Sequence, residues 1–188
     1  MVRWLRYFAY GSNMHPARLR ERTPSCRRIG VASLPGYALR FNQASRVDGS
    51  AKCNIMATGA TAEDRVLGVV FELPVAERSS LDRAEGLGHS YQLRELAVRL
   101  DGREEGVFCY TALPEAIDDR LLPFRWYREI VLHGARQHDF PTSYLSRISS
   151  VAVIDDPDPR RDARHRALLE IDEPLRPAIR CRKDSRGV

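Results

Sequence analysis

The segment VLGVVFEL, Val66 to Leu73, limits the folds open to this chain more than any other stretch. It is apolar almost throughout, and Pro74, which breaks regular structure, follows it directly. A short apolar run that ends at such a residue predicts a strand buried on both faces, near the centre of a sheet. The rest of the chain must therefore fold around a sheet.

The remaining pattern places most strands before most helices. Strands are predicted at Trp4–Tyr10, Gly36–Gln43, Cys53–Gly59, Tyr91–Leu100 and Gly106–Ala112, the last two joined by the turn residues Asp101-Gly102. Helices are predicted at His15–Arg22, Val75–Gly86, about Pro123–His138, a short stretch through Tyr144 and Ile148, and near Arg164–Glu170. The segment DDPDPRRD reads as a solvated connection. Because strands and helices do not alternate strictly, we expect an α+β fold with a mixed sheet that could close into a barrel.

The distribution of charge argues against a nucleic-acid partner. The 188 residues carry a formal net charge of +5, but residues 159–188 alone hold nine Arg or Lys against five Asp or Glu. The rest of the chain therefore carries only +1, and we expect no basic patch on the folded body. No apolar run is long enough to span a bilayer, and arginines interrupt the apolar N-terminus, so a membrane partner and a secretory signal are not expected. The cytoplasm is the expected compartment.

The four cysteines do not form a metal-binding or disulfide pattern. Cys26, Cys53, Cys109 and Cys181 lie far apart, without a CxxC pair or a histidine at ligand spacing. We therefore expect reduced thiols and no metal.

The segment FAYGSN ends the first predicted strand on three residues that disfavour a strand interior. Gly11 permits close approach of a ligand, and Ser12 and Asn13 add side-chain donors. Consecutive N–H groups in such a turn, followed by a helix, can form a cradle for an anion or a developing oxyanion. The alternative is a turn that merely ends the strand. The pattern lacks the glycines and lysine of a phosphate loop.

Glu85, in SLDRAEG, falls at the C-terminal end of a predicted helix. The negative end of the helix dipole disfavours a charged carboxylate there, and an acid placed against this preference is a candidate general acid/base. A solvated glutamate before a helix-ending glycine is the alternative.

Three motifs together, FAYGSNM, SLDRAEG and PFRWYREIVLHGA with FPTSYLSRI, resemble the ordered motif set of the γ-glutamylcyclotransferase family, which includes AIG2-like proteins. The resemblance spans about residues 6–150. It implies a small mixed β-barrel flanked by helices, with a catalytic domain over residues 1–155. Residues 156–188 would form an Arg/Pro-rich C-terminal extension, partly helical or flexible, that matches nothing in the family.

The family resemblance also implies a reaction and a site. These enzymes release 5-oxoproline from a small γ-glutamyl compound, without cofactor or metal, by attack of the substrate's α-amine on its γ-carbonyl. Glu85 would be the catalytic acid/base. The substrate-binding positions would be Tyr7, Phe8, Ala9, Tyr10, Gly11, Ser12, Tyr91 and Tyr127.

Several neighbouring side chains have two interpretations. His89 is either a surface histidine or an influence on Glu85. The tyrosines could all be core residues with satisfied hydroxyls. Arg125 and Arg128 form either a solvated face or a site for a substrate carboxylate.

The expected function is a γ-glutamylcyclotransferase acting on a γ-glutamyl amino acid or γ-glutamylamine. A non-catalytic AIG2-like module that binds a small ligand or a protein is the alternative. A third hypothesis, that the Arg-rich tail binds RNA or an acidic membrane, predicts a steep salt dependence. The identity of the γ-glutamyl compound and the oligomeric state are left open.

Overall fold

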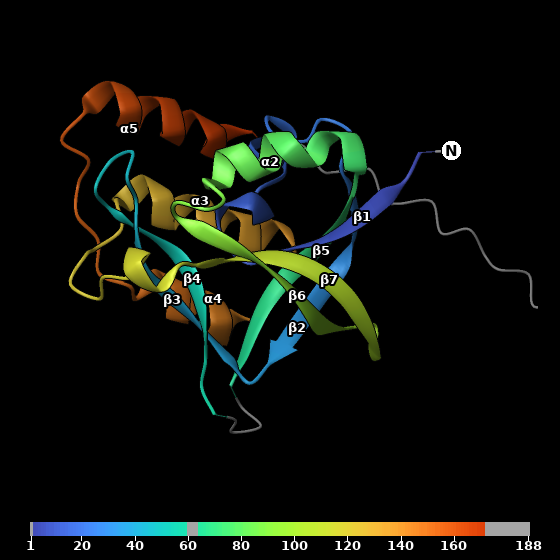
Figure 1. Cartoon of the computed structure of the whole chain (residues 1–188). Coiled ribbons are helices and arrows are strands. Elements are labelled where there is room, and N and C mark those ends of the chain that lie inside the picture. Colours follow the sequence, from blue (N-terminus) through green and yellow to red (C-terminus); the bar gives the residue numbers. More distant parts are fainter. Residues whose placement is uncertain (1, 60–63, 172–188) are drawn as a thin grey trace, which may run out of the picture.

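Five strands close into a barrel (Figure 1). The computed structural model describes residues 2–59 and 64–171. The barrel order is β1–β5–β2–β6–β7, in which β1 and β7 run parallel and all other neighbours antiparallel. The strands are β1 (Trp4–Ala9), β2 (Arg27–Pro35), β5 (Arg65–Pro74), β6 (Tyr91–Leu100) and β7 (Arg103–Ala112). The expected α+β fold with a mixed barrel is confirmed.

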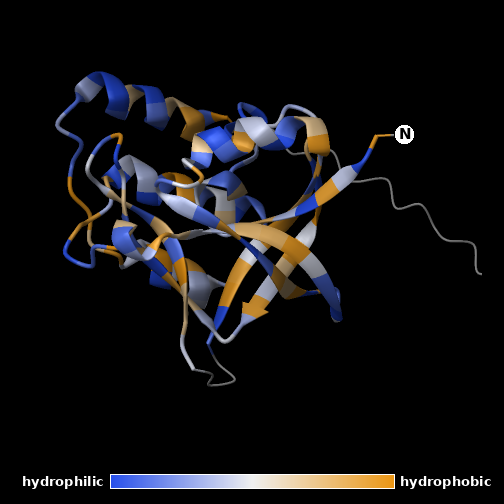
Figure 2. Ribbon diagram, in the orientation of Figure 1, coloured by the Kyte–Doolittle hydropathy of each residue, from blue (hydrophilic) through white to orange (hydrophobic). Residues whose placement is uncertain are grey.

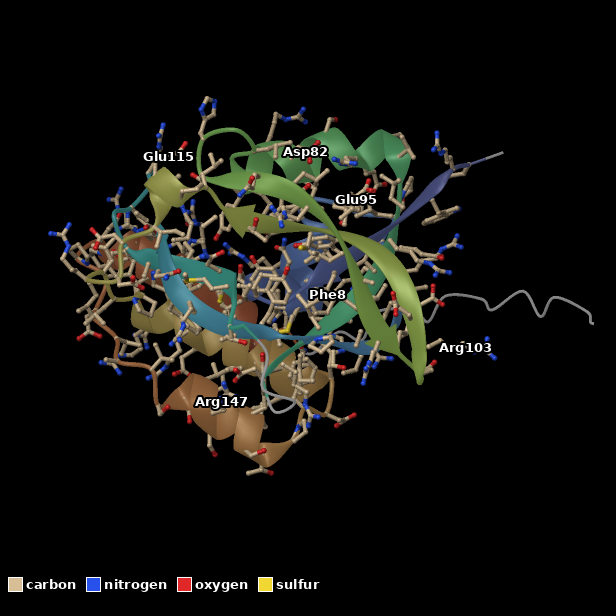
Figure 3. The ribbon with its side chains drawn as sticks, turned by 60° about the horizontal axis from the view of Figure 1, so that its bottom comes forward. Phe8, Asp82, Glu95, Arg103, Glu115 and Arg147 are labelled. Atoms are coloured by element: carbon tan, nitrogen blue, oxygen red, sulfur yellow. The ribbon has the colours of Figure 1, made fainter. Side chains whose placement is uncertain are left out.

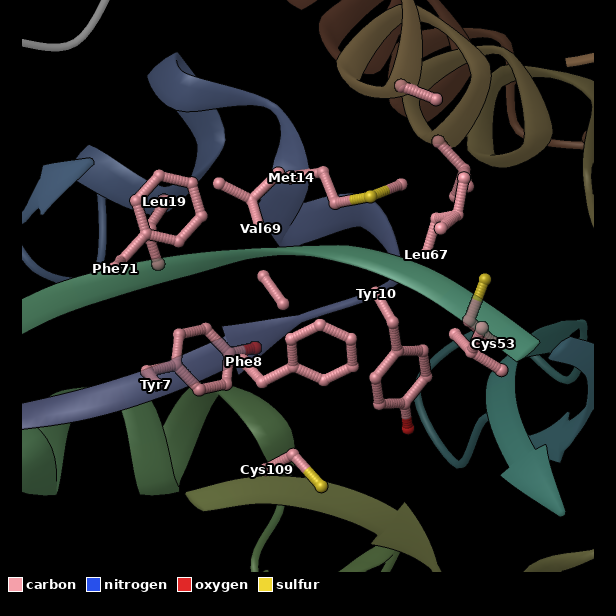
Figure 4. Packing of buried hydrophobic residues seen from close by; sticks show 14 of the residues in the cluster. Tyr7, Phe8, Tyr10, Met14, Leu19, Cys53, Leu67, Val69, Phe71 and Cys109 are labelled. Carbon is pink, nitrogen blue, oxygen red and sulfur yellow. The ribbon is translucent and has the colours of Figure 1, made fainter. Parts of the chain in front are cut away.

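Strand β5 is the central strand that its sequence predicts. It pairs with β1 on one side and with β2 on the other, and every residue from Val66 to Phe71 is buried. Gly68 has no room for a side chain, because a Cβ there would lie 2.5 Å from Cε2 of Phe8. Phe8, fully buried, packs against β5 together with Tyr7 and the other core residues shown in Figure 4.

Strand β2 is missing from the sequence prediction, which placed nothing regular between Arg22 and Gly36. The strand begins with Arg27 and Arg28, and a bulge between Arg28 and Gly30 interrupts its register with β5. Only two of its residues are fully buried, so neither an apolar run nor a clean alternation marks it. Pairing with β5 and β6 defines this strand, and that pairing is non-local.

A second, two-stranded sheet lies beside the barrel. It consists of β3 (Tyr37–Ala44) and β4 (Ala51–Ala57), paired antiparallel. Asn54 on β4 joins it to the barrel, because its Oδ1 accepts a hydrogen bond from the backbone N–H of Ala112 at 2.9 Å. This contact holds β4 against the end of β7, where the candidate site forms.

Helices cover the barrel ends and its flank (Figure 1). The α-helices are α1 (Pro16–Arg20), α2 (Arg78–Glu85), α3 (Arg125–Gln137), α4 (Thr142–Ser149) and α5 (Pro159–Arg166). The 3₁₀ helices are η1 (Ser12–Met14), η2 (Val75–Glu77), η3 (Pro114–Ala116) and η4 (Ala167–Glu170). Helix α2 ends at Gly86, whose φ of +63° gives the left-handed cap that glycine favours. No described helix is long and apolar enough to cross a membrane.

Helix α5 is mostly hydrophilic, in contrast to the barrel strands (Figure 2). It begins inside the segment that the sequence suggested as a solvated connection, since Pro159 is its first residue and the Asp158 side chain accepts from two backbone N–H groups. The His165 ring stacks on Trp126 of α3, with ring centroids 3.8 Å apart. The described part of the C-terminal extension therefore contacts the body. Residues 172–188, with Cys181, lie outside the described residues.

Candidate functional site

The loop that follows β1 presents main-chain donors. The chain leaves β1 at Ala9 and enters η1 at Ser12. Within the part of the chain that the structure describes, the backbone N–H groups of Gly11, Ser12 and Asn13 donate no hydrogen bond. Three consecutive unpaired donors can receive the oxygen of an anion or an oxyanion.

Close packing explains the glycine in this loop. A Cβ at Gly11 would lie 2.9 Å from Cβ of Cys53 on β4 and 3.5 Å from the Tyr127 hydroxyl. The φ of Gly11 is −119°, so the backbone conformation itself does not require glycine. The requirement is one of space, since a Cβ at this position would collide with Cys53 and push β4 away from the loop.

Glu85 faces this loop from the last residue of α2. Its Oε1 accepts from Asn13 Nδ2 at 2.8 Å and from Arg22 Nη1 at 2.9 Å, and its side chain is only 16% exposed. These donors stabilise a carboxylate that the end of the helix disfavours. No described residue donates to Oε2, so one carboxylate oxygen is held in place and the other is open to a ligand.

Asn13 and Arg22 organise the carboxylate. Asn13 Nδ2 also donates to the Tyr7 hydroxyl at 2.9 Å, and Arg22 Nη1 donates to Asn13 Oδ1. From the sequence, Asn13 is only a possible side-chain donor, and Arg22 has no expected function. Arg22 carries no local signal, because its partner Glu85 is 63 positions away in the chain.

Tyrosines form the walls of the site. Tyr91 donates to the carbonyl of Cys53 at 2.7 Å, and Tyr127 accepts from the backbone N–H of Cys53 at 3.0 Å. Tyr10 donates to the carbonyl of Tyr110, and Tyr110 donates to Asp82 at 2.5 Å. Burial raises the pKa of all four phenols well above the ordinary value, so they are neutral hydrogen-bonding groups.

A small cavity of about 30 Å³ lies among these groups. Its lining is Tyr7, Tyr10, Gly11, Ser12, Asn13, Cys53, Glu85, Tyr91, Tyr110 and Tyr127. Most of the predicted positions therefore converge. Two do not line the cavity: Phe8 is fully buried in the barrel core, at its centre in Figure 3, and Ala9 is 1% exposed. Tyr110 and Cys53 line it without having been predicted.

The other candidates lie elsewhere. His89 is exposed and lines neither this cavity nor the wider cleft beside it. Arg125 pairs with Asp155 at 2.8 Å, and Arg128 donates to the carbonyls of Ser149 and Val151. These two arginines contact the segment after α4, and neither lines the small cavity.

The buried cysteine of the cavity is a poor nucleophile. Burial raises the pKa of the Cys53 thiol to about 12, so the thiolate needed for nucleophilic attack is scarce at neutral pH. The three described cysteines are free thiols. Among residues 2–59 and 64–171, no group of three or more His, Cys, Asp or Glu side chains could hold a metal ion.

The fold and the site together define a small barrel protein with one polar, tyrosine-lined cavity beside a fixed carboxylate. Residues 7–129 match the family model described as "Gamma-glutamyl cyclotransferase, AIG2-like", and the chain belongs to this family.

Two relatives are named gamma-glutamylcyclotransferase. The chain is 28% identical over 151 residues to a gamma-glutamylcyclotransferase of Homo sapiens and 26% identical over 150 residues to that of Bos taurus, covering 79% of each sequence in both comparisons. A solved structure named gamma-glutamyl cyclotransferase superposes with a TM-score of 0.76 at 24% identity, covering 88% of this chain and 99% of that one. YkqA from Bacillus subtilis superposes with a TM-score of 0.67 at 22% identity, covering 80% of this chain and 56% of that one. At these identities the two structures support the fold.

Proposed function

We propose that this protein is a γ-glutamylcyclotransferase that releases 5-oxoproline from a small γ-glutamyl compound. The observation that carries the proposal is the placement of Glu85, with one carboxylate oxygen fixed by Asn13 and Arg22 and the other open, beside the unpaired amides of Gly11 and Ser12. Family membership supports the reaction class.

The reaction needs one proton carrier. At neutral pH the α-amine of a γ-glutamyl compound is protonated, and Glu85 removes that proton. The free amine attacks the γ-carbonyl carbon, which forms the C–N bond of a five-membered ring and places negative charge on the carbonyl oxygen. Glu85 gives its proton to the nitrogen of the original amide, whose bond to the carbonyl carbon breaks as the intermediate collapses. Glu85 then takes the second proton from the ring nitrogen and passes it to the departing amine, so that the ring nitrogen becomes a neutral lactam N–H. The products are 5-oxoproline and a free amine or amino acid.

The loop amides supply the electrostatic part of the reaction. The N–H groups of Gly11 and Ser12 receive the oxyanion, and the loss of one such donor typically costs about 3–4 kcal/mol of transition-state stabilisation. The phenols of Tyr91 and Tyr127 are fixed by their hydrogen bonds to the backbone of Cys53, so the cavity wall is preorganised. Holding the amine near the carbonyl in a rotamer that can cyclise is the remaining contribution.

The direct test is a product assay. The purified protein is incubated with γ-glutamyl amino acids, γ-glutamylamines and glutathione, and 5-oxoproline is measured by mass spectrometry. We expect release of 5-oxoproline in equal amount to the freed amine from at least one compound. Binding of these compounds in a calorimeter without any product would reject the enzyme and favour the non-catalytic binding module.

A further inference from the structure

A wider cleft opens from the small cavity. Its volume is about 320 Å³, and it shares Ser12, Glu85, Tyr91 and Tyr127 with the small cavity. If a γ-glutamyl group occupies the small cavity, the departing group extends into this cleft. The chemistry of the cleft therefore selects the departing group, and this inference rests on the proposed function.

Basic side chains outnumber acidic ones in the lining of the cleft. Seven basic side chains line it, against the two carboxylates of Asp48 and Glu85. The seven are Arg18, Arg22, Arg46, Lys52, Arg83, Arg161 and Arg164. Five of them belong to the folded body, so the expectation of no basic patch there is wrong. The net charge of the folded body is close to zero, and a net charge does not show where the basic side chains lie. The fold brings basic residues that are distant in the sequence together at one place.

Some of these charges are already compensated. Arg22 pairs with Glu85 at 2.9 Å, Lys52 with Asp48 at 2.8 Å, and Arg161 with Asp156 at 2.5 Å. Among the described residues, no carboxylate forms an ion pair with Arg18, Arg46, Arg83 or Arg164. The cleft thus carries positive charge beyond what its own acids neutralise.

Among the described residues of the cleft, Arg18 differs from the other cations without an ion pair because it is buried. It is only 9% exposed and yet lines the cleft, and its Nε donates to Ser12 Oγ at 3.0 Å. Burial, and secondarily the neighbouring Arg22, lowers its pKa to about 10, so the guanidinium is charged at neutral pH. A buried cation without a direct ion pair is costly, and a ligand carboxylate would supply the missing contact.

The C-terminal helix completes the cleft. Stacking of His165 on Trp126, together with the Asp156 carboxylate that accepts from both Trp126 Nε1 and Arg161, holds α5 against α3, on the same side of the molecule as α2 (Figure 1). This placement brings the exposed Arg164 to the rim of the cleft, which the exposed Arg46 on the loop between β3 and β4 also lines. Within the described part of the chain, the cleft therefore has one buried cation without an ion pair, Arg18, and three exposed ones, Arg46, Arg83 and Arg164.

We propose that the preferred substrates are γ-glutamyl compounds whose departing group is an acidic amino acid or acidic peptide, with at least two carboxylates. One carboxylate meets Arg18 in the depth of the cleft and the other meets Arg46 and Arg164 at the rim. Arginine binds carboxylates in a planar, two-point geometry that suits this task. Neutral γ-glutamylamines leave these charges unpaired.

The test uses a matched pair of substrates. γ-Glutamylglutamate and γ-glutamylglutamine differ only in a carboxylate and an amide. We expect kcat/KM for release of 5-oxoproline to be at least about tenfold higher with γ-glutamylglutamate at low salt, and the ratio to fall in 0.5 M NaCl because the rim charges are exposed. A ratio near one would overturn the proposal.

Two variants test whether Arg46 and Arg164 cause the preference for γ-glutamylglutamate. The double variant Arg46→Gln/Arg164→Gln changes exposed side chains and is expected to reduce the substrate ratio at least threefold. Arg103→Gln is the control, because Arg103 is exposed at the far end of β7 (Figure 3) and lines neither cavity. An unchanged ratio in the double variant would overturn the proposal.

Binding separates this inference from the proposed function. If no γ-glutamyl compound yields 5-oxoproline, the proposed function fails, and calorimetry with the same two dipeptides still decides the inference. Tighter binding of γ-glutamylglutamate, lost in the double variant but not in Arg103→Gln, supports it. Equal affinity for both dipeptides overturns it.

Discussion

Asn13 links the Glu85 carboxylate to the rest of the site. Its amide donates both to Glu85 and to Tyr7, and its oxygen accepts from Arg22. One short side chain thus connects the loop, the acid and the wall of the cavity. The neighbouring Ser12 accepts a hydrogen bond from Arg18 through its Oγ. The loop therefore contacts both Glu85 and Arg18.

Asn13→Asp is expected to lower kcat/KM by about 10- to 100-fold. The substitution preserves size but places a second carboxylate within hydrogen-bond distance of Glu85 and removes one of the two donors to Oε1. Steady-state kinetics on the best γ-glutamyl substrate measure the effect, and thermal unfolding shows whether the fold is intact. Full activity in a folded Asn13→Asp protein would mean that the network does not position the acid.

Cys53 is expected to resist alkylation. Because its thiol has a pKa of about 12, only about one molecule in ten thousand carries the thiolate at pH 8, and the residue is buried. Iodoacetamide treatment of the native protein, followed by peptide mass spectrometry, should leave Cys53 unmodified, whereas the denatured protein is alkylated. Rapid modification of native Cys53 with loss of activity would indicate an activated thiol.

Helix α3 shows how an element positions the site. It carries Tyr127 toward the loop, and its Gly134 allows the helix backbone to approach η1 closely. A Cβ at Gly134 would lie 2.8 Å from the backbone nitrogen of His15 and 2.9 Å from the carbonyl carbon of Met14. The helix cannot move outward without moving Tyr127.

Gly134→Ala is therefore expected to destabilise the protein, although alanine favours a helix by roughly 1 kcal/mol. We expect a net loss of about 1–3 kcal/mol in the free energy of unfolding, because the added methyl group meets backbone atoms that cannot rotate away. Urea unfolding of this variant is compared with Gly106→Ala, where no atom lies within 4 Å of the added Cβ. A more stable Gly134→Ala protein would show that the helix propensity of alanine outweighs the close contact of its Cβ with the backbone of Met14 and His15.

The elements that sequence predicted well are those with local signals. A few consecutive residues are enough to identify three features of the fold. These are the apolar run of β5, the Asp101-Gly102 turn between β6 and β7, and the glycine cap of α2. Strand β2 gave no such signal, and its identity depends on partners elsewhere in the chain.

The site also contains parts with a local sequence signal and parts that depend on residues distant in the sequence. The loop after β1 and Glu85 carry local anomalies, a strand that ends on Gly-Ser-Asn and an acid at a helix end, and both were predicted. Arg22 and the cationic cleft depend on residues brought together by the fold, and they could not be predicted from spacing. The domain boundary at residue 155 stays a prediction, as does the binding function of the tail, most of which lies outside the described residues.

The molecule as a whole should lose stability in mild acid. Burial, and secondarily His133, lowers the pKa of His15 from 6.5 to about 4, and Arg18 and His138 add to the effect. Neither ring nitrogen of His15 has a hydrogen-bond partner among the described residues. Above pH 6.5 the histidine is neutral in both states, so the stability is fully present. As the pH falls from 6.5 to 4, the unfolded chain binds a proton that the folded protein does not, and stability decreases.

We expect the free energy of unfolding to fall by about 2 kcal/mol across this window on account of His15. Urea unfolding at several pH values measures the slope, and His15→Leu should flatten it. An identical slope in the His15→Leu protein would exclude His15 as the source.

The central claim is that the Glu85 carboxyl group carries the proton between the α-amine and the departing amine. Glu85→Gln preserves the size of the side chain but removes the base. Turnover of the best γ-glutamyl substrate by this variant is compared with Glu104→Gln, which changes an exposed glutamate on β7. The account predicts a loss in kcat of about 10²–10⁴-fold for Glu85→Gln and none for Glu104→Gln. Release of 5-oxoproline by Glu85→Gln within tenfold of the unmodified protein would contradict it.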